Sequence, residues 1–159
     1  MEEITMTLTF EKLSHVPENL EDIFTDCSIY DRYFAGSSSL SRSLQQAAES
    51  QELYVARNEC GQIVSALRLA IRGFCGLYPY IKLFGVHPAF RSQGVGRQML
   101  DYIEKVAKES GARRITLMVS DFNTQAQAVY RKRGYTLLGT IPDAVKPGIA
   151  ELLMIKDLP

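Results

Sequence analysis

The order of hydrophobic and polar positions predicts a chain in which strands and helices alternate. Apolar runs or two-residue alternation, typical of strands, occur at residues 5–10, 53–57, 63–71, 80–86, 115–120, 135–141 and 150–155. Apolar residues at helical spacing occur at residues 17–33, 40–50, 94–110 and 124–133. Strands and helices in this succession indicate a sheet domain of the α/β or α+β class.

Glycine, proline and asparagine mark several boundaries of these elements. Residues 58–61, Asn-Glu-Cys-Gly, separate two predicted strands and predict a hairpin loop, because Asn and Gly tolerate positive φ. Pro88 ends the strand at 80–86. Gly111 and Gly134 suit the C-terminal ends of the third and fourth predicted helices.

Length and charge narrow the class of protein. A chain of 159 residues predicts one domain, residues 1–159. The 18 basic and 18 acidic side chains cancel, which argues against a non-specific nucleic-acid binder. No apolar run approaches the roughly 18 residues that suggest a membrane span, and the first residues, Met-Glu-Glu, are acidic where a signal peptide is basic. We therefore expect no nucleic-acid or membrane partner, and a monomer or a homodimer.

The cysteines and histidines predict neither disulfides nor a metal centre. The chain has an odd number of cysteines at wide spacings, namely Cys27, Cys60 and Cys75. This pattern is unlike that of a disulfide framework or a zinc knuckle. Two histidines add no metal-binding pattern. This usage fits a reducing, cytoplasmic setting.

The most informative segment joins the predicted strand at 80–86 to the predicted helix at 94–110. Gly94 and Gly96 open this helix, and the N–H groups and dipole of a helix start bind anions. Glycines let a phosphate approach the backbone, and Arg91 and Arg97 add positive charge. The alternative is that the glycines only form a tight turn.

Two common phosphate motifs do not fit this segment. A dinucleotide fingerprint, GxGxxG, needs a small residue where this chain has Met99. A P-loop, GxxxxGK[ST], is absent. A Rossmann-type nucleotide enzyme is therefore disfavoured.

Residues 91–96, Arg-Ser-Gln-Gly-Val-Gly, resemble the RxxGxG acyl-CoA loop of the GCN5-related N-acetyltransferase (GNAT) family. The preceding residues 86–90, Val-His-Pro-Ala-Phe, match that family as well. Residues 123–135 follow the family's downstream signature, with Asn123, Ala126, Tyr130 and a Gly-Tyr pair in the same order. The two motifs lie about 30 residues apart, and the resemblance covers about residues 50–156.

The resemblance implies a fold and an activity. The fold is a central mixed, mostly antiparallel sheet of about seven strands, flanked by about four helices and splayed between the strands that end at Val86 and Ser120. The activity is direct transfer of an acetyl group from acetyl-CoA, without a metal, to a primary amine of a small molecule or peptide. The alternative is a non-catalytic acyl-CoA-binding or regulatory module. The cofactor-binding residues that the resemblance implies are Phe84, Gly85, Val86, Arg91, Ser92, Gln93, Gly94, Val95, Gly96, Arg97, Asn123, Ala126 and Tyr130.

We expect a specific role or backbone feature for four of these residues. The resemblance implies that the Val86 amide stabilises the oxyanion and that Tyr130 protonates the CoA thiolate. It implies that Asn123 bonds the pantetheine arm, although Asn is also a good helix N-cap. Gly85 inside a strand suggests a bulge or a close backbone approach.

The general base and the acceptor stay open. Many family members carry Glu five residues before the Asn, where this chain has Met118. Tyr80, Asp121, Glu151 or a water chain are the alternatives for the base. The candidate acceptor-binding residues are Tyr30, Tyr80 and Glu151.

Two further features of the sequence have a plain interpretation. The position of His87 in a loop predicts a solvated histidine and not a general base. Acidic residues between 18 and 31 form either a solvated helix face or a surface that steers a cationic amine.

Overall fold

The computed structural model describes residues 5–25, 30–36 and 38–159, and the chain forms two compact units. The first unit comprises Met1–Leu69 and Leu83–Ile103, and the second comprises Ala70–Lys82 and Glu104–Pro159. Strands β3 (Ile63–Phe74) and β4 (Tyr78–Val86) and helix α2 (Val95–Glu109) each contribute to both units. The expectation of a single domain stays a prediction.

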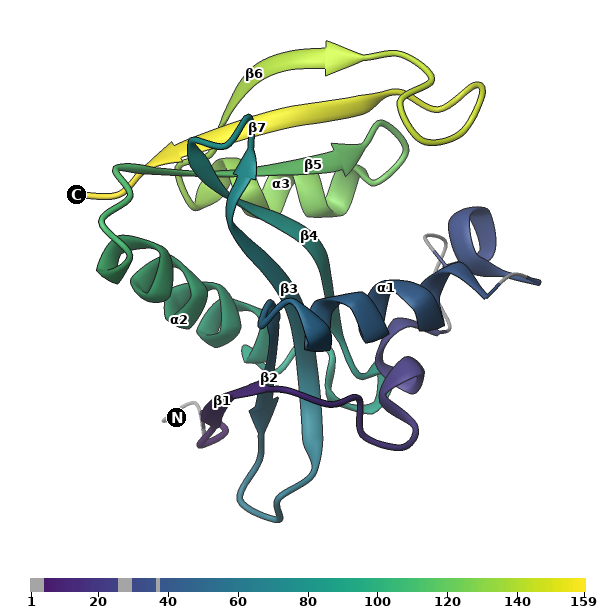
Figure 1. The fold of residues 1–159 in the computed structure, drawn as a ribbon, viewed down its shortest axis with the longest axis vertical. Helices are drawn as coiled ribbons and strands as arrows, with labels where there is room; N and C mark the ends of the chain where they lie inside the picture. Colours follow the sequence, from purple (N-terminus) through teal and green to yellow (C-terminus); the bar gives the residue numbers. More distant parts are fainter. Residues whose placement is uncertain (1–4, 26–29, 37) are drawn as a thin grey trace. The chain divides into compact units, whose positions relative to one another are not determined.

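The remaining elements complete a mixed sheet with helices (Figure 1). They are β1 (Thr9–Leu13), the 3₁₀ helix η1 (Leu20–Phe24), the π-helix η2 (Tyr30–Phe34), α1 (Ser39–Glu49), β2 (Leu53–Arg57), the 3₁₀ helix η3 (Pro88–Phe90), β5 (Arg114–Ser120), α3 (Thr124–Lys132), β6 (Thr136–Ile141) and β7 (Glu151–Asp157). The seven strands follow the order β1-β2-β3-β4-β5-β7-β6. β1 with β2, β2 with β3, β5 with β7 and β6 with β7 are antiparallel, whereas β4 and β5 are parallel. The expected mixed, mostly antiparallel sheet is confirmed.

Most predicted boundaries agree with the structure to within one or two residues. The hairpin loop between β2 and β3 is confirmed, with Asn58 Oδ1 accepting hydrogen bonds from the backbone N–H groups of Cys60 and Gln62. Gly111 and Gly134 follow α2 and α3 at φ of 90° and 99°, which glycine adopts without strain. Local turn chemistry therefore determined these ends.

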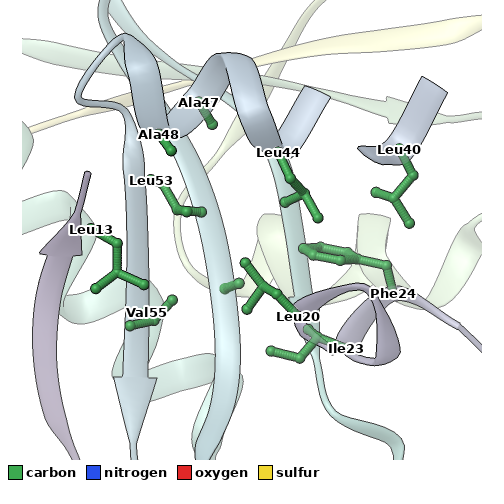
Figure 2. Close-up of a cluster of buried hydrophobic side chains, with 11 residues drawn as sticks. Leu13, Leu20, Ile23, Phe24, Leu40, Leu44, Ala47, Ala48, Leu53 and Val55 are labelled. Atoms are coloured by element: carbon green, nitrogen blue, oxygen red, sulfur yellow. The ribbon is translucent and has the colours of Figure 1, made fainter. Parts of the chain in front are cut away.

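The core of the first unit lies where α1 meets β2 and η1. Figure 2 shows the side chains of these elements pointing toward one another. Leu44, Ala47, Ala48 and Leu53 have no exposed surface. Burial of a leucine side chain contributes about 1.5–3 kcal/mol, so the apolar face of α1 is a main source of stability in this unit.

The single helix predicted over residues 17–33 is wrong. The structure has two short helical segments, η1 and η2, and residues 26–29 lie outside the described residues. Asn19 has a φ of 62°, which no α-helix accommodates, and Thr25 is extended. Leu20 and Ile23 are three residues apart, and three residues per turn suit a 3₁₀ helix. Their burial therefore needs only one such turn.

The first strand lies later in the chain than the predicted residues 5–10. β1 begins at Thr9 and pairs with β2 in a register that sets Leu13 opposite Leu53. The preceding segment is held by α2 instead, because Gln98 Nε2 donates to the carbonyl of Met6 at 2.9 Å. Strand pairing, rather than alternation alone, decided the boundary.

A buried carboxylate organises the second unit. Glu104, on α2, is 9% exposed and accepts hydrogen bonds from Arg133 Nη2 at 2.8 Å and from the Tyr135 hydroxyl at 3.3 Å. Lys156 of β7 forms a second ion pair with the same carboxylate. One side chain thus ties α2 to the end of α3 and to β7.

We predict that Glu104→Ala lowers the free energy of unfolding by about 3–5 kcal/mol, because it leaves two partly buried cations without their carboxylate. Urea denaturation measures the change. Glu109→Ala is the matched control on the same helix. Its 3.9 Å pair with Lys105 is exposed, so the loss should stay below about 1 kcal/mol. Equal losses in the two variants would contradict the role of Glu104.

Candidate active site

In the first unit, the loop before α2 has a backbone conformation that is typical of anion-binding loops. Ser92 and Gly94 both have positive φ, 62° and 80°, and the helix begins directly after them at Val95. Successive N–H groups in such a conformation form a concave nest for anions. The first N–H groups of a helix lack intrahelical acceptors and point in the same direction. This geometry suits a phosphate or pyrophosphate.

The two arginines of the loop have different surroundings. Arg91 Nε donates to the Val86 carbonyl at 3.1 Å, and its Nη2 donates to the Thr25 carbonyl at 3.2 Å. Arg91 therefore holds the loop against the end of β4 and the chain after η1. Arg97 is exposed in the first turn of α2, where its positive charge would favour an anion bound at the loop.

The end of β4 directs one backbone N–H away from β3. The Gly85 carbonyl accepts a hydrogen bond from Ser65 Oγ at 2.8 Å, and the His87 N–H donates to the Val64 carbonyl at 2.8 Å. Backbone groups of successive strand residues point to opposite edges. The Val86 N–H therefore lies on the edge away from β3, as an oxyanion donor requires.

A close approach at Gly85 is confirmed, and the approaching group in the structure is a side chain. A Cβ on Gly85 would lie 2.8 Å from ring carbons of Phe24 and 3.2 Å from Ile23. The packing of η1 on β4 thus requires glycine here. The sequence suggests a bulge or a close backbone approach at Gly85, but it does not identify Phe24, because this contact joins segments that are distant in the chain.

In the second unit, Asn123 caps α3. Its Oδ1 accepts a hydrogen bond from the Ala126 N–H at 3.2 Å, so the capping interpretation is confirmed. This bond uses the side-chain oxygen, and the amide NH₂ is the group that could donate to a ligand. Ala126 lies in the first turn, half-buried.

Tyr130, in the last turn of α3, packs edge-on against Tyr135 with ring centroids 5.6 Å apart. Burial raises the pKa of Tyr130 to about 12, and the nearby Arg133 cation opposes that rise. The hydroxyl is therefore protonated at neutral pH and is a hydrogen-bond donor.

The acceptor candidates lie on different elements. Tyr80 is half-buried on β4 and Glu151 is 5% exposed at the start of β7, both in the second unit. Tyr30 begins η2 in the first unit, and its side chain is outside what the structure describes. Ser120 Oγ donates to Glu151 Oε1 at 3.2 Å. Sequence reasoning missed this serine, because nothing local marks a contact between residues that far apart in the chain.

His87 has a structural partner. His87 Nδ1 accepts a hydrogen bond from the Ala89 N–H at 3.1 Å, so this histidine caps η3. A hollow of about 400 Å³ in the first unit, lined by Glu18, Asp22 and His87 among others, contains none of the predicted site residues. Among the residues that the structure describes, no group of three or more His, Cys, Asp or Glu could hold a metal ion. No described helix is long and apolar enough to cross a membrane.

Comparisons with known proteins find similar sequences and similar folds. An uncharacterised protein of Bacillus subtilis strain 168, YdhI, is 29% identical in an alignment 114 residues long, which covers 65% of this chain and 68% of that protein. A Bacillus cereus ATCC 10987 acetyltransferase structure of the GNAT family has a TM-score of 0.70 and 16% identity, over 96% of this chain and 99% of its own.

A second similar structure contains a ligand. It comes from Bacillus anthracis strain Ames, is provisionally named a streptothricin acetyltransferase and is in complex with acetyl coenzyme A. It has a TM-score of 0.60 and 22% identity, over 67% of this chain and 62% of its own. The sequence profile of the acetyltransferase (GNAT) family matches residues 18–135. With the glycine loop, the capped α3 and the mixed sheet in place, this match shows that the chain belongs to the acetyltransferase (GNAT) family.

Proposed function

We propose that this protein transfers an acetyl group from acetyl-CoA directly to a primary amine of a small molecule or peptide. The observation that carries the proposal is the loop at Ser92 and Gly94, whose positive φ angles and following helix start suit a bound anion. Membership of an acetyltransferase family supports the activity. The acetyl-CoA complex of the Bacillus anthracis structure supports the cosubstrate.

The residues proposed for the chemistry come from both units. In the first unit, residues 91–97 would hold the pyrophosphate, and the Val86 N–H would donate to the thioester oxygen as negative charge develops there. In the second unit, the Asn123 amide would donate to the pantetheine arm, and the Tyr130 hydroxyl would protonate the departing thiolate. Tyr130 suits this role because its raised pKa, about 12, keeps the proton on the hydroxyl until the thiolate forms.

Two measurements on the purified protein test the activity. Calorimetry measures acetyl-CoA binding, and a thiol reagent follows CoA release in the presence of a panel of primary amines. Binding together with amine-dependent thiol release supports an acetyltransferase. Binding without release from any amine would instead indicate an acyl-CoA-binding module, and absence of binding would reject both functions.

For the loop, we predict that Gly96→Glu weakens acetyl-CoA binding at least tenfold, about 1.4 kcal/mol, because it brings a negative charge to the pyrophosphate site. Calorimetry measures the dissociation constant. Gly96→Ala is the matched control. Its Cβ would lie 3.5 Å from Phe84 and Val86, an ordinary contact, so its affinity should stay within about threefold of wild type. Unchanged affinity in a folded Gly96→Glu variant would reject the loop as the CoA site.

For the proton donor, we predict that Tyr130→Phe lowers kcat by roughly 10²–10⁴, because the ring packing remains and only the hydroxyl is lost. Acetyl-CoA affinity should change little. Tyr135→Phe is the matched control, since it removes the neighbouring hydroxyl that bonds Glu104. That control should cost about 1 kcal/mol of stability and leave kcat near wild type. Thiol-release kinetics distinguish the two variants, and a wild-type kcat in Tyr130→Phe would make this tyrosine a packing residue.

A further inference from the structure

A buried hydroxyl group on β3 contacts the strand end that carries the Val86 N–H. Ser65 Oγ donates a hydrogen bond to the Gly85 carbonyl at 2.8 Å. Ser65 has no exposed surface, and its neighbours on β3, Val64 and Ala66, are equally buried. A hydroxyl in such surroundings costs free energy unless it is hydrogen-bonded, whereas an alanine would carry no such cost. The Gly85 carbonyl is therefore the acceptor that makes a serine compatible with this position.

The Gly85 carbonyl and the Val86 N–H belong to the same peptide group. This peptide is trans, and a trans peptide is planar, so its C=O and N–H bonds point in opposite directions. A hydrogen bond that holds the carbonyl on the β3 side therefore holds the N–H on the other side. Hydrogen bonds in series also polarise one another, so the bond from Ser65 makes the Val86 N–H a stronger donor.

Two other contacts of this strand end act on a different peptide group. The His87 N–H donates to the Val64 carbonyl at 2.8 Å, and Arg91 Nε donates to the Val86 carbonyl at 3.1 Å. Both bonded groups belong to the peptide between Val86 and His87, which is one position further along the chain. Ser65 thus holds the peptide that contains the Val86 N–H, whereas Arg91 holds the next one.

We propose, on the basis of the acetyltransferase function above, that Ser65 is a positioning residue for this reaction. Its hydrogen bond holds the peptide between Gly85 and Val86 so that the Val86 N–H donates to the thioester oxygen as negative charge develops there. A donor that is already in place needs no reorganisation at the moment of reaction, and this is the source of its effect on the rate.

The step that Ser65 supports balances in atoms and electrons. The lone pair of the neutral amine forms the C–N bond, and the carbonyl π pair moves onto the oxygen. That pair re-forms the C=O bond as the C–S bonding pair leaves with the sulfur. In net terms the sulfur gains the one proton that the nitrogen loses, which yields one amide and one CoA thiol. Ser65 forms and breaks no covalent bond, and its hydroxyl keeps its proton throughout.

Ser65→Ala tests the assignment, because it removes the hydroxyl and leaves the Val86 N–H in the chain. We expect kcat from thiol release to fall about tenfold, which is less than the roughly 10²–10³ that loss of a whole oxyanion donor costs. The acetyl-CoA dissociation constant from calorimetry should stay within about twofold of wild type, because the lost interaction strengthens only in the transition state.

Thr116→Val, in the second unit, is the matched control. Thr116 Oγ1 donates to the Pro79 carbonyl, which also belongs to β4, at 2.8 Å, and Thr116 has no exposed surface. Valine keeps the shape of threonine, so this variant also loses a buried hydroxyl bond to β4, but at another residue of that strand. Its kcat should stay within about twofold of wild type. Equal loss of kcat in the two variants would overturn the inference, as would a folded Ser65→Ala variant with wild-type kcat.

Infrared spectroscopy of bound acetyl-CoA, isotope-labelled at the thioester carbonyl, separates positioning from a loss of stability. A hydrogen bond to the carbonyl oxygen lowers the C=O stretching frequency. We expect the wild-type band to lie below that of free acetyl-CoA and the Ser65→Ala band to shift back toward the free value. Thr116→Val should give the wild-type band. Identical bands in wild type and Ser65→Ala would overturn the inference.

Ser65→Cys completes the test if Ser65→Ala does not fold, as judged by circular dichroism. Cysteine is close to serine in size, and its S–H is only a weak donor. We expect a fall in kcat and a shift of the infrared band in the same direction as for Ser65→Ala, both smaller. A folded Ser65→Cys variant with wild-type kcat and the wild-type band would overturn the role of this hydroxyl.

Failure of the acetyltransferase function would give a different result. Wild-type protein that releases no thiol with any amine would overturn that function itself. Wild-type protein that releases thiol, together with a Ser65→Ala variant that matches it, would overturn only the role of Ser65.

Discussion

Hydrogen bonding at the end of β4 is the constraint on which the proposed chemistry depends. Gly85 and His87 direct their backbone bonds to β3, so the intervening Val86 N–H lies on the other edge of the strand. The absence of a side chain at Gly85 lets Phe24 pack at this point, and Arg91 ties the Val86 carbonyl to the glycine loop. The packing of Phe24, the hydrogen bonds between β4 and β3 and the position of the glycine loop therefore all depend on the end of β4.

The second unit uses two buried carboxylates in different ways. Glu104 is surrounded by Arg133, Lys156 and the Tyr135 hydroxyl, and its charge is matched within the fold. Glu151 lies on the opposite face of the sheet beside Ser120, where the partner that the structure records at 3.2 Å is a neutral hydroxyl. The first carboxylate joins α2 to the end of α3 and to β7, and the second joins the end of β5 to the start of β7.

Local sequence patterns predicted most of the helices and strands. They were wrong where contacts between distant segments determine the bounds of an element. The apolar faces of α1 and α2 and their glycine or loop ends are strong local signals, and both helices were placed correctly. Residues 17–33 have helical spacing as well, yet Asn19 has a φ of 62° and Thr25 is extended, so only a 3₁₀ turn forms there. Residues 5–10 alternate like a strand, but the pairing of Leu13 with Leu53 moves the strand to Thr9–Leu13.

From the amino-acid sequence by itself, the period of apolar residues predicted the alternating strands and helices, and short motifs predicted the glycine loop and the family. The family resemblance in turn implied the mixed sheet. Only the tertiary structure decided the direction of the Val86 N–H, the packing of Phe24 on Gly85 and the meeting of Ser120 with Glu151. The last of these joins residues 31 positions apart in the chain. Such contacts arise from strand register, which depends on how all strands pair together, and no local window of the sequence contains that information.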